Sequence, residues 1–119
     1  MIVVAFGLIA VAGGLGAVLR FVLSGWIGKL PWGILTANTL ASLVIGLILR
    51  SADTSGFMAA LVATGLCGGL STFSSFSAQT VEYFKAKQLW RALANIALNF
   101  VLPTAAALAG LYLADSLLK

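Results

Sequence analysis

Residues 65–77 read Gly-Leu-Cys-Gly-Gly-Leu-Ser-Thr-Phe-Ser-Ser-Phe-Ser, and this stretch decides how the chain folds. It places glycines, hydroxyl groups and two phenylalanines inside a segment that is otherwise apolar. In the hydrocarbon of a bilayer, loosened backbone and hydroxyl groups are stable only when they are buried in protein or line a path for water or ions. The stretch therefore predicts a site inside a membrane.

The composition around this stretch is that of a membrane protein. Of the 119 residues, 61% are hydrophobic and 8% are charged, which is too little polar surface for a soluble globule of this size. Four apolar runs cover about 2–24, 31–50, 57–80 and 88–116, each near the ~20 residues that a helix needs to cross the hydrocarbon. The short connections between them predict a single domain over 1–119, all α-helical, with four transmembrane helices.

The third span is expected to be interrupted halfway across the membrane. Gly68 and Gly69 weaken the helix there, and a broken helix exposes carbonyl groups at the end of one half and N–H groups at the start of the next. Carbonyls suit a cation, whereas amides and hydroxyls suit an anion. Phe73 and Phe76 are three residues apart and project to one side, and the positive edge of an aromatic ring can face a partly dehydrated anion.

Amide side chains in the other spans also point to an enclosed polar path. Asn38 lies in the second span, and Asn95 and Asn99 lie four residues apart on one face of the fourth, so we expect them to face protein or water rather than lipid. Gly13 and Ala17 share a face of the first span and favour close helix packing.

The number of helices bears on the oligomeric state. Four helices are too few to enclose a path and also pack together, so we expect a homodimer.

The charged residues weakly specify the orientation. The basic residues fall in two groups, with Lys29, Lys85, Lys87, Arg20 and Arg91 on one side and Arg50 and Lys119 on the other. This excess favours a cytoplasmic first group, but it nearly vanishes when the two arginines inside the helices are left out. Insertion in both orientations and a fixed orientation with a differently oriented paralogue as partner both stay open.

Several classes of function are excluded. The basic residues form no stripe, which argues against nucleic acid as a partner. A single cysteine, Cys67, and the absence of histidine exclude an intramolecular disulfide and histidine-based acid–base chemistry. No nucleophile–base pair is apparent, so we do not expect an enzyme.

Three motifs resemble those of the small bacterial fluoride channels, the CrcB or Fluc family. Residues 13–21, Gly-Gly-Leu-Gly-Ala-Val-Leu-Arg-Phe, are similar to the opening GGxxGAxxR(Y/F) of that family. Residues 33–46, with Asn38 inside, resemble its second-helix pattern, and residues 68–77 resemble GGLTTFSTFS. The resemblance covers nearly the whole chain.

The resemblance implies an antiparallel, dual-topology homodimer in the bacterial plasma (inner) membrane, with two fluoride pathways and a structural sodium ion at its centre. It implies that main-chain carbonyls of Gly68 and Ser71 of each subunit hold the sodium. The residues that the resemblance implies for the fluoride path are Asn38, Phe73, Phe76, Ser74, Ser75 and Ser77. From the sequence itself, we expect structural roles for Arg20, Thr72, Asn95 and Asn99. The chain departs from the family pattern at Gln79, where an acidic residue is common, and at Asn95 and Asn99, where Tyr and Ser are common.

A passive channel is the expected mechanism. Asp53, Glu82 and Asp115 all lie at span ends, so no carboxylate inside a span couples proton flow to transport. Fluoride would enter the cell as neutral hydrogen fluoride, ionise in the cytoplasm and leave through the pore down its electrochemical gradient.

Two other functions are alternatives to a passive fluoride channel. A small multidrug-type proton-coupled exporter needs a glutamate within its first helix, and residues 2–19 contain no acid. A non-transporting membrane assembly protein would account for the packing glycines but not for the hydroxyl-rich interruption.

Overall fold

The computed structural model describes residues 2–50 and 56–117, and every regular element within them is helical. The elements are α1 (Ile2–Ser24), α2 (Trp32–Arg50), α3 (Phe57–Ala60), the π-helical turn η1 (Leu61–Cys67), α4 (Gly68–Leu70), α5 (Phe73–Lys85) and α6 (Leu89–Leu117). Lys119, one of the basic residues expected to orient the chain, and Asp53, one of the carboxylates expected at span ends, lie outside the described residues.

Three of the four expected spans are single long helices. Helices α1, α2 and α6 are long and apolar enough to cross a membrane, and α6 reaches roughly 43 Å at ~1.5 Å per residue. The third run is divided among α3, η1, α4 and α5, none of which has the length of a single spanning helix. The described residues thus form an all-helical protein with three candidate membrane-spanning helices and one segmented element.

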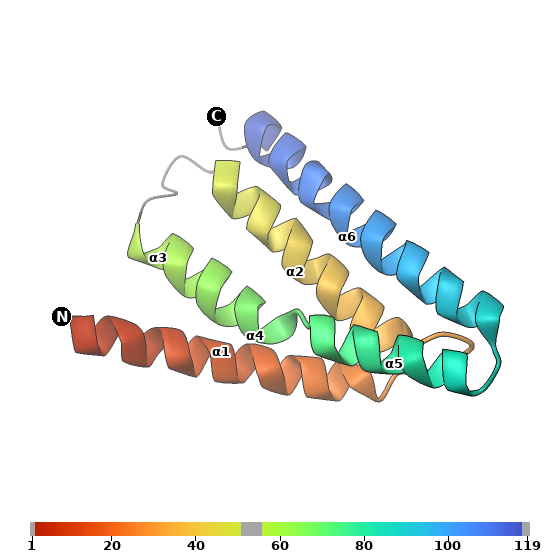
Figure 1. The fold of residues 1–119 in the computed structure, drawn as a ribbon. Coiled ribbons are helices and arrows are strands. Elements are labelled where there is room, and N and C mark those ends of the chain that lie inside the picture. The colour runs from red at the N-terminus through yellow and green to blue at the C-terminus, as the bar shows by residue number, and fades with distance from the viewer. Residues whose placement is uncertain (1, 51–55, 118–119) are drawn as a thin grey trace.

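The helices lie side by side in a flat arrangement (Figure 1). The first half of the segmented element, η1 and α4, packs along α1, whereas α5 packs against α6. Helix α2 packs along α6. The molecule measures 50 × 34 × 17 Å, so its thinnest dimension is less than two helix diameters of about 10 Å. Both broad faces of a single chain are consequently open, and large apolar side chains such as Phe21 and Phe100 remain exposed.

Glycines allow the two helix pairs to approach closely. A β-carbon on Gly110 of α6 would overlap the main-chain carbonyl oxygen of Leu43 in α2, and one on Gly46 of α2 would overlap that of Ala107. Between α1 and α4, a β-carbon on Gly69 would overlap the carbonyl oxygen of Gly13. Small residues at helix contacts let membrane helices gain packing energy that the surrounding lipid does not supply.

The backbone between α4 and α5 is extended at Ser71 and Thr72. Gly68 keeps helical angles (φ −62°, ψ −37°), whereas Ser71 has ψ 151° and Thr72 has φ −152° and ψ 122°. The extended residues thus follow the glycines at which the sequence predicts the interruption. The physical cause is a helix cap, because the Thr72 hydroxyl accepts a hydrogen bond from the Ser75 N–H at 3.0 Å and begins α5 there.

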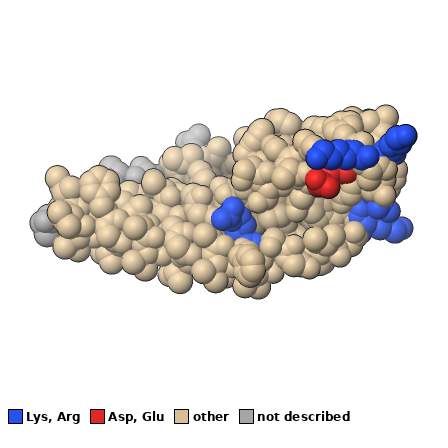
Figure 2. Space-filling view, turned by 60° about the horizontal axis from the view of Figure 1, so that its bottom comes forward, with Lys and Arg blue, Asp and Glu red and all other residues tan. Residues whose placement is uncertain are grey.

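Most of the charged side chains visible in Figure 2 lie at one end of the molecule, and a separate basic group lies near its middle. The rest of the visible surface carries no charge. The connection from α1 to α2 and the end of α5 meet at this end, where the Tyr83 hydroxyl donates to the Lys29 carbonyl oxygen at 3.5 Å. The tight turn into α6 places Lys87 at φ 59°, and its N–H donates to the Phe84 carbonyl oxygen at 3.1 Å. Lys29, Lys85 and Lys87 therefore share one end of the fold, as the charge pattern predicts.

The packing of α2 against α6 yields the first prediction. Replacing Gly110 by Ala forces the two helices apart, and we expect it to lower the free energy of unfolding by about 1–3 kcal/mol, the usual cost of overpacking. Unfolding in mixed detergent micelles measures the effect. The matched control is Gly7→Ala in α1, because a β-carbon there meets nothing within 4 Å. Equal stability of the two variants would contradict this account of the helix contact.

Candidate functional site

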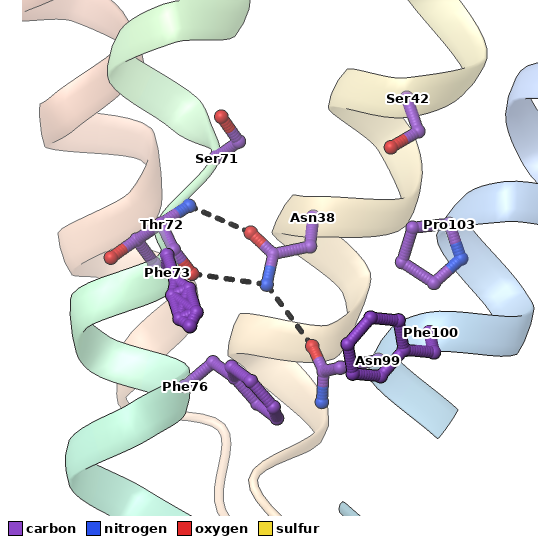
Figure 3. Close-up of a pocket in the computed structure, with 9 residues that line it drawn as sticks. All are labelled: Asn38, Ser42, Ser71, Thr72, Phe73, Phe76, Asn99, Phe100 and Pro103. Carbon is purple, nitrogen blue, oxygen red and sulfur yellow. Dashed lines mark hydrogen bonds between the residues drawn. The ribbon is translucent and has the colours of Figure 1, made fainter. Parts of the chain in front are cut away.

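An open cavity of about 280 Å³ lies where the junction of α4 and α5 meets α2 and α6 (Figure 3). The residues that line it are Asn38, Ser42, Ser71, Thr72, Phe73, Phe76, Asn99, Phe100 and Pro103. The polar groups among them are amides and hydroxyls, and none of these lining side chains is ionisable. The cavity therefore offers neutral hydrogen-bonding groups and aromatic rings to an occupant.

The Asn38 side chain holds the extended backbone at Thr72 through two hydrogen bonds. Its Oδ1 accepts from the Thr72 N–H at 2.7 Å, and its Nδ2 donates to the Thr72 carbonyl oxygen at 3.2 Å. A main-chain N–H only donates and a carbonyl only accepts, so this pair of bonds sets the direction of the Asn38 amide. Helix α2 thus stabilises the interruption between α4 and α5.

A chain of hydrogen bonds leads from Asn38 across α6 to α5. The second N–H of Asn38 donates to Oδ1 of Asn99 at 3.0 Å, and Nδ2 of Asn99 donates to both the main-chain oxygen and Oδ1 of Asn95 at 2.9 Å. Nδ2 of Asn95 donates to the Thr80 hydroxyl at 3.0 Å, and this hydroxyl donates to the Phe76 carbonyl oxygen at 2.9 Å. The chain joins three helices in the interior.

The direction of every bond in this chain follows from its two ends. The Phe76 carbonyl can only accept, so the Thr80 hydroxyl must donate to it and accept from Asn95. The same reasoning passes through Asn99 to Asn38, where it agrees with the direction that the main chain imposes from the other end. Both N–H groups of Asn38 and both of Asn99 are consequently occupied.

The two phenylalanines lie on the cavity as an edge-to-face pair. The centroids of Phe73 and Phe76 are 5.6 Å apart, and their planes make an angle of 87°. This is a favourable arrangement for aromatic rings, because the positive edge of one meets the negative face of the other. Phe73 is 69% exposed in the single chain, so its ring is available to a group in the cavity or to a second subunit.

Two main-chain carbonyls at the interruption lack their usual helical donors. In an α-helix the carbonyl of residue i accepts from the N–H of residue i+4. The Thr72 N–H donates to Asn38 instead of Gly68, and the Ser75 N–H donates to the Thr72 hydroxyl instead of Ser71. The carbonyls of Gly68 and Ser71 are thereby left for another partner, and both residues are exposed in the single chain. Exposed carbonyl oxygens of this kind fit a hard cation.

The structure brings six of the sequence-predicted residues to the cavity, namely Asn38, Ser71, Thr72, Phe73, Phe76 and Asn99. Asn95 lies behind them, 2% exposed, as a link in the hydrogen-bond chain. Gly68 and Ser77 do not line this cavity.

Three predicted residues lie elsewhere. Ser74 is exposed, and its hydroxyl lies 3.2 Å from that of Thr72. Ser75 shares a second hollow of about 200 Å³ with Arg20, next to Ile34. The serines after the interruption thus divide between separate surfaces.

Sequence reasoning missed four residues of the site, which are Ser42, Thr80, Phe100 and Pro103. Spacing carried the signal for three of them, because each lies four residues after a residue already singled out: Ser42 after Asn38, Thr80 after Phe76, and Pro103 after Asn99. Phe100 had no such signal, because residues one apart on a helix do not share a face.

The helix cap at Thr72 yields the second prediction. Thr72→Val keeps the side-chain shape but removes the acceptor for the Ser75 N–H, so we expect the free energy of unfolding to fall by about 1 kcal/mol. The measurement is again unfolding in mixed micelles. Ser74→Ala is the control, since this exposed hydroxyl caps no main-chain group in the described residues. Equal stability of Thr72→Val and Ser74→Ala would show that the Thr72 cap does not stabilise the start of α5.

Comparison with known proteins adds to this geometry. The family model described as "CrcB-like protein, Camphor Resistance (CrcB)" matches residues 7–111. A protein of Syntrophotalea carbinolica named fluoride-specific ion channel FluC is 40% identical over 118 residues, covering 92% of this chain and 96% of that protein.

Two further relatives carry the same name. One, from Pyrococcus horikoshii, is 39% identical over 79% of this chain and 82% of its own length. The other, from Leptospira interrogans, is 36% identical over 89% of this chain and 91% of its own length. The similarity thus extends over nearly all of the helices described above.

Proposed function

The chain belongs to the CrcB family of fluoride channels, and from this premise we propose that it is a fluoride-selective channel that lets cytoplasmic fluoride leave the cell passively. It is a multi-pass protein of the inner membrane, and its family is one of ion channels rather than enzymes. We further propose which residues form the fluoride path, that a sodium ion stabilises the assembly, and that fluoride flows outward.

The cavity between α2, α5 and α6 is the observation that carries the proposal. It combines amides, hydroxyls and aromatic rings within an otherwise apolar molecule. Fluoride is small and accepts hydrogen bonds strongly, so hydroxyl and N–H groups can replace part of its water shell. The rings of Phe73 and Phe76 add positive ring edges to the wall of the cavity.

The neutral lining supports passive flow. A proton-coupled exporter needs an ionisable group beside the transported ion, and none of the residues that line the cavity is ionisable. An inside-negative potential drives an anion outward by about 2.3 kcal/mol per charge per 100 mV. The membrane potential and the fluoride gradient are therefore sufficient to move the ion out.

A second copy of the chain would complete the assembly as an antiparallel homodimer. The molecule is only 17 Å thick in one dimension, and Gly68 and Ser71, whose carbonyls lack their helical donors, are exposed residues in the single chain. Free carbonyls are not tolerated against lipid, so protein must cover them. In the proposed dimer these four carbonyls, two from each subunit, hold a sodium ion, which would supply a positive charge near the anion path.

Fluoride efflux from liposomes tests the channel function and yields the third prediction. Wild-type protein should release fluoride, and Phe76→Leu should lower the flux by about tenfold, equivalent to ~1.4 kcal/mol of barrier, because it removes a ring edge from the cavity. A fluoride electrode measures the release. Phe84→Leu on the same helix, outside the cavity, is the matched control and should keep wild-type flux. Ready chloride release without fluoride release would contradict the proposal.

The proposed sodium site yields the fourth prediction. Replacing sodium by N-methylglucamine during purification and assay should lower the flux severalfold, because free carbonyls at the interruption then lose their partner. Restoring sodium should restore the flux. Equal flux in both salts would remove sodium from the mechanism while leaving the channel function intact.

A further inference from the structure

The hydrogen bond between Asn38 and Asn99 lies on the wall of the cavity (Figure 3). Asn38 has two side-chain N–H groups, one bonded to the Thr72 carbonyl at 3.2 Å and the other to Oδ1 of Asn99 at 3.0 Å. An anion in the cavity therefore meets no free N–H on Asn38. It obtains one only by displacing one of these two acceptors.

Asn99 is the acceptor that can leave. The Thr72 carbonyl belongs to main chain that Asn38 also holds through the Thr72 N–H, so its departure would require the junction of α4 and α5 to move. Oδ1 of Asn99 belongs to a side chain, and a rotation of that amide is enough to release Asn38. The bond from Nδ2 of Asn99 to the main-chain oxygen of Asn95 favours the return of the same oxygen to Asn38, because it orients the amide.

We propose, on the basis of the proposed channel function, that Asn99 competes with fluoride for one N–H of Asn38. Oδ1 of Asn99 accepts from this N–H when the cavity is empty, and fluoride replaces it as the acceptor when it binds. A charged acceptor forms a stronger hydrogen bond than a neutral amide oxygen, so fluoride displaces Asn99. The bond that must be broken reduces the affinity of the site. A conducting site needs this property, because an ion that binds too tightly does not move on. Asn99 thus sets the balance between fluoride affinity and flux.

Asn99→Ser isolates this role. A serine hydroxyl in a helix can donate to the carbonyl four residues earlier, here that of Asn95, but the side chain is too short to occupy the N–H of Asn38. We expect the fluoride concentration that gives half-maximal flux to fall about twofold to tenfold, the range expected for loss of one neutral hydrogen bond. The maximal flux should fall as well, because release becomes slower. Fluoride titration of the detergent-solubilised protein by calorimetry should show the same gain in affinity.

Asn99→Asp should act in the opposite direction. A carboxylate binds the Asn38 N–H more strongly than an amide oxygen and repels an anion, so the half-saturating fluoride concentration should rise. Opposite shifts from two substitutions at one position are not expected if Asn99 only supports the fold. Should Asn99→Ser fail to purify as folded protein, Asn99→Thr, whose hydroxyl makes the same main-chain bond, takes its place.

Asn95→Ser is the matched control. It breaks the side-chain bonds to Thr80 and Asn99. It leaves the bond from Asn99 to the main-chain oxygen of residue 95 and the bond between Asn99 and Asn38 in place. It should lower thermal stability without lowering the half-saturating fluoride concentration. The competitor role is overturned if Asn99→Ser leaves that concentration unchanged or raises it, or if both serine variants lower it equally. Wild-type liposomes that release no fluoride would instead refute the channel function itself.

Discussion

The two hydrogen bonds between the Asn38 side chain and the main chain of Thr72 are the interaction on which the rest of the site depends. They satisfy a piece of extended backbone that the bilayer would otherwise not tolerate. By occupying the Thr72 N–H they deprive the Gly68 carbonyl of its helical donor, and by setting the direction of the amide they determine what Asn38 presents to Asn99. The half-buried Asn38 side chain thus affects both the carbonyl of Gly68 and the hydrogen bonding in the cavity.

Helix packing determines whether these groups can meet. The glycines at the contact of α2 and α6 bring the two backbones close enough for Asn38 and Asn99 to bond directly. At the other side of the molecule, Gly69 lets α4 rest on the main chain of α1 beside Gly13, which holds the first half of the interrupted element in place. Small residues far from the cavity therefore contribute to its geometry through helix separation.

Because the chain is flat, a single copy leaves part of the site uncovered by protein. In a molecule 17 Å thick, the cavity is open, and Gly68 and Ser71 remain exposed residues in the single chain. A bilayer offers these groups no hydrogen bonds, so their satisfaction has to come from another protein surface or a bound ion. This constraint supports the proposed homodimer, in which each thin chain would cover the open face of the other.

Composition and motif order were enough to determine the class of this protein, because a chain with 61% hydrophobic residues has no soluble alternative, and the long apolar runs that became α1, α2 and α6 are readable directly. Residue spacing also brought forward Asn38, Phe73, Phe76 and Asn99. The tertiary structure decided the rest. The extended residues lie at Ser71 and Thr72 because the Asn38 amide accepts from the Thr72 N–H and the Thr72 hydroxyl accepts from the Ser75 N–H. Neither N–H is then available to a helical carbonyl. Likewise, Asn95 and Thr80 bond to each other only because α5 and α6 pack together. Helical spacing shows which residues of one helix share a face, but it does not show which face another helix will contact.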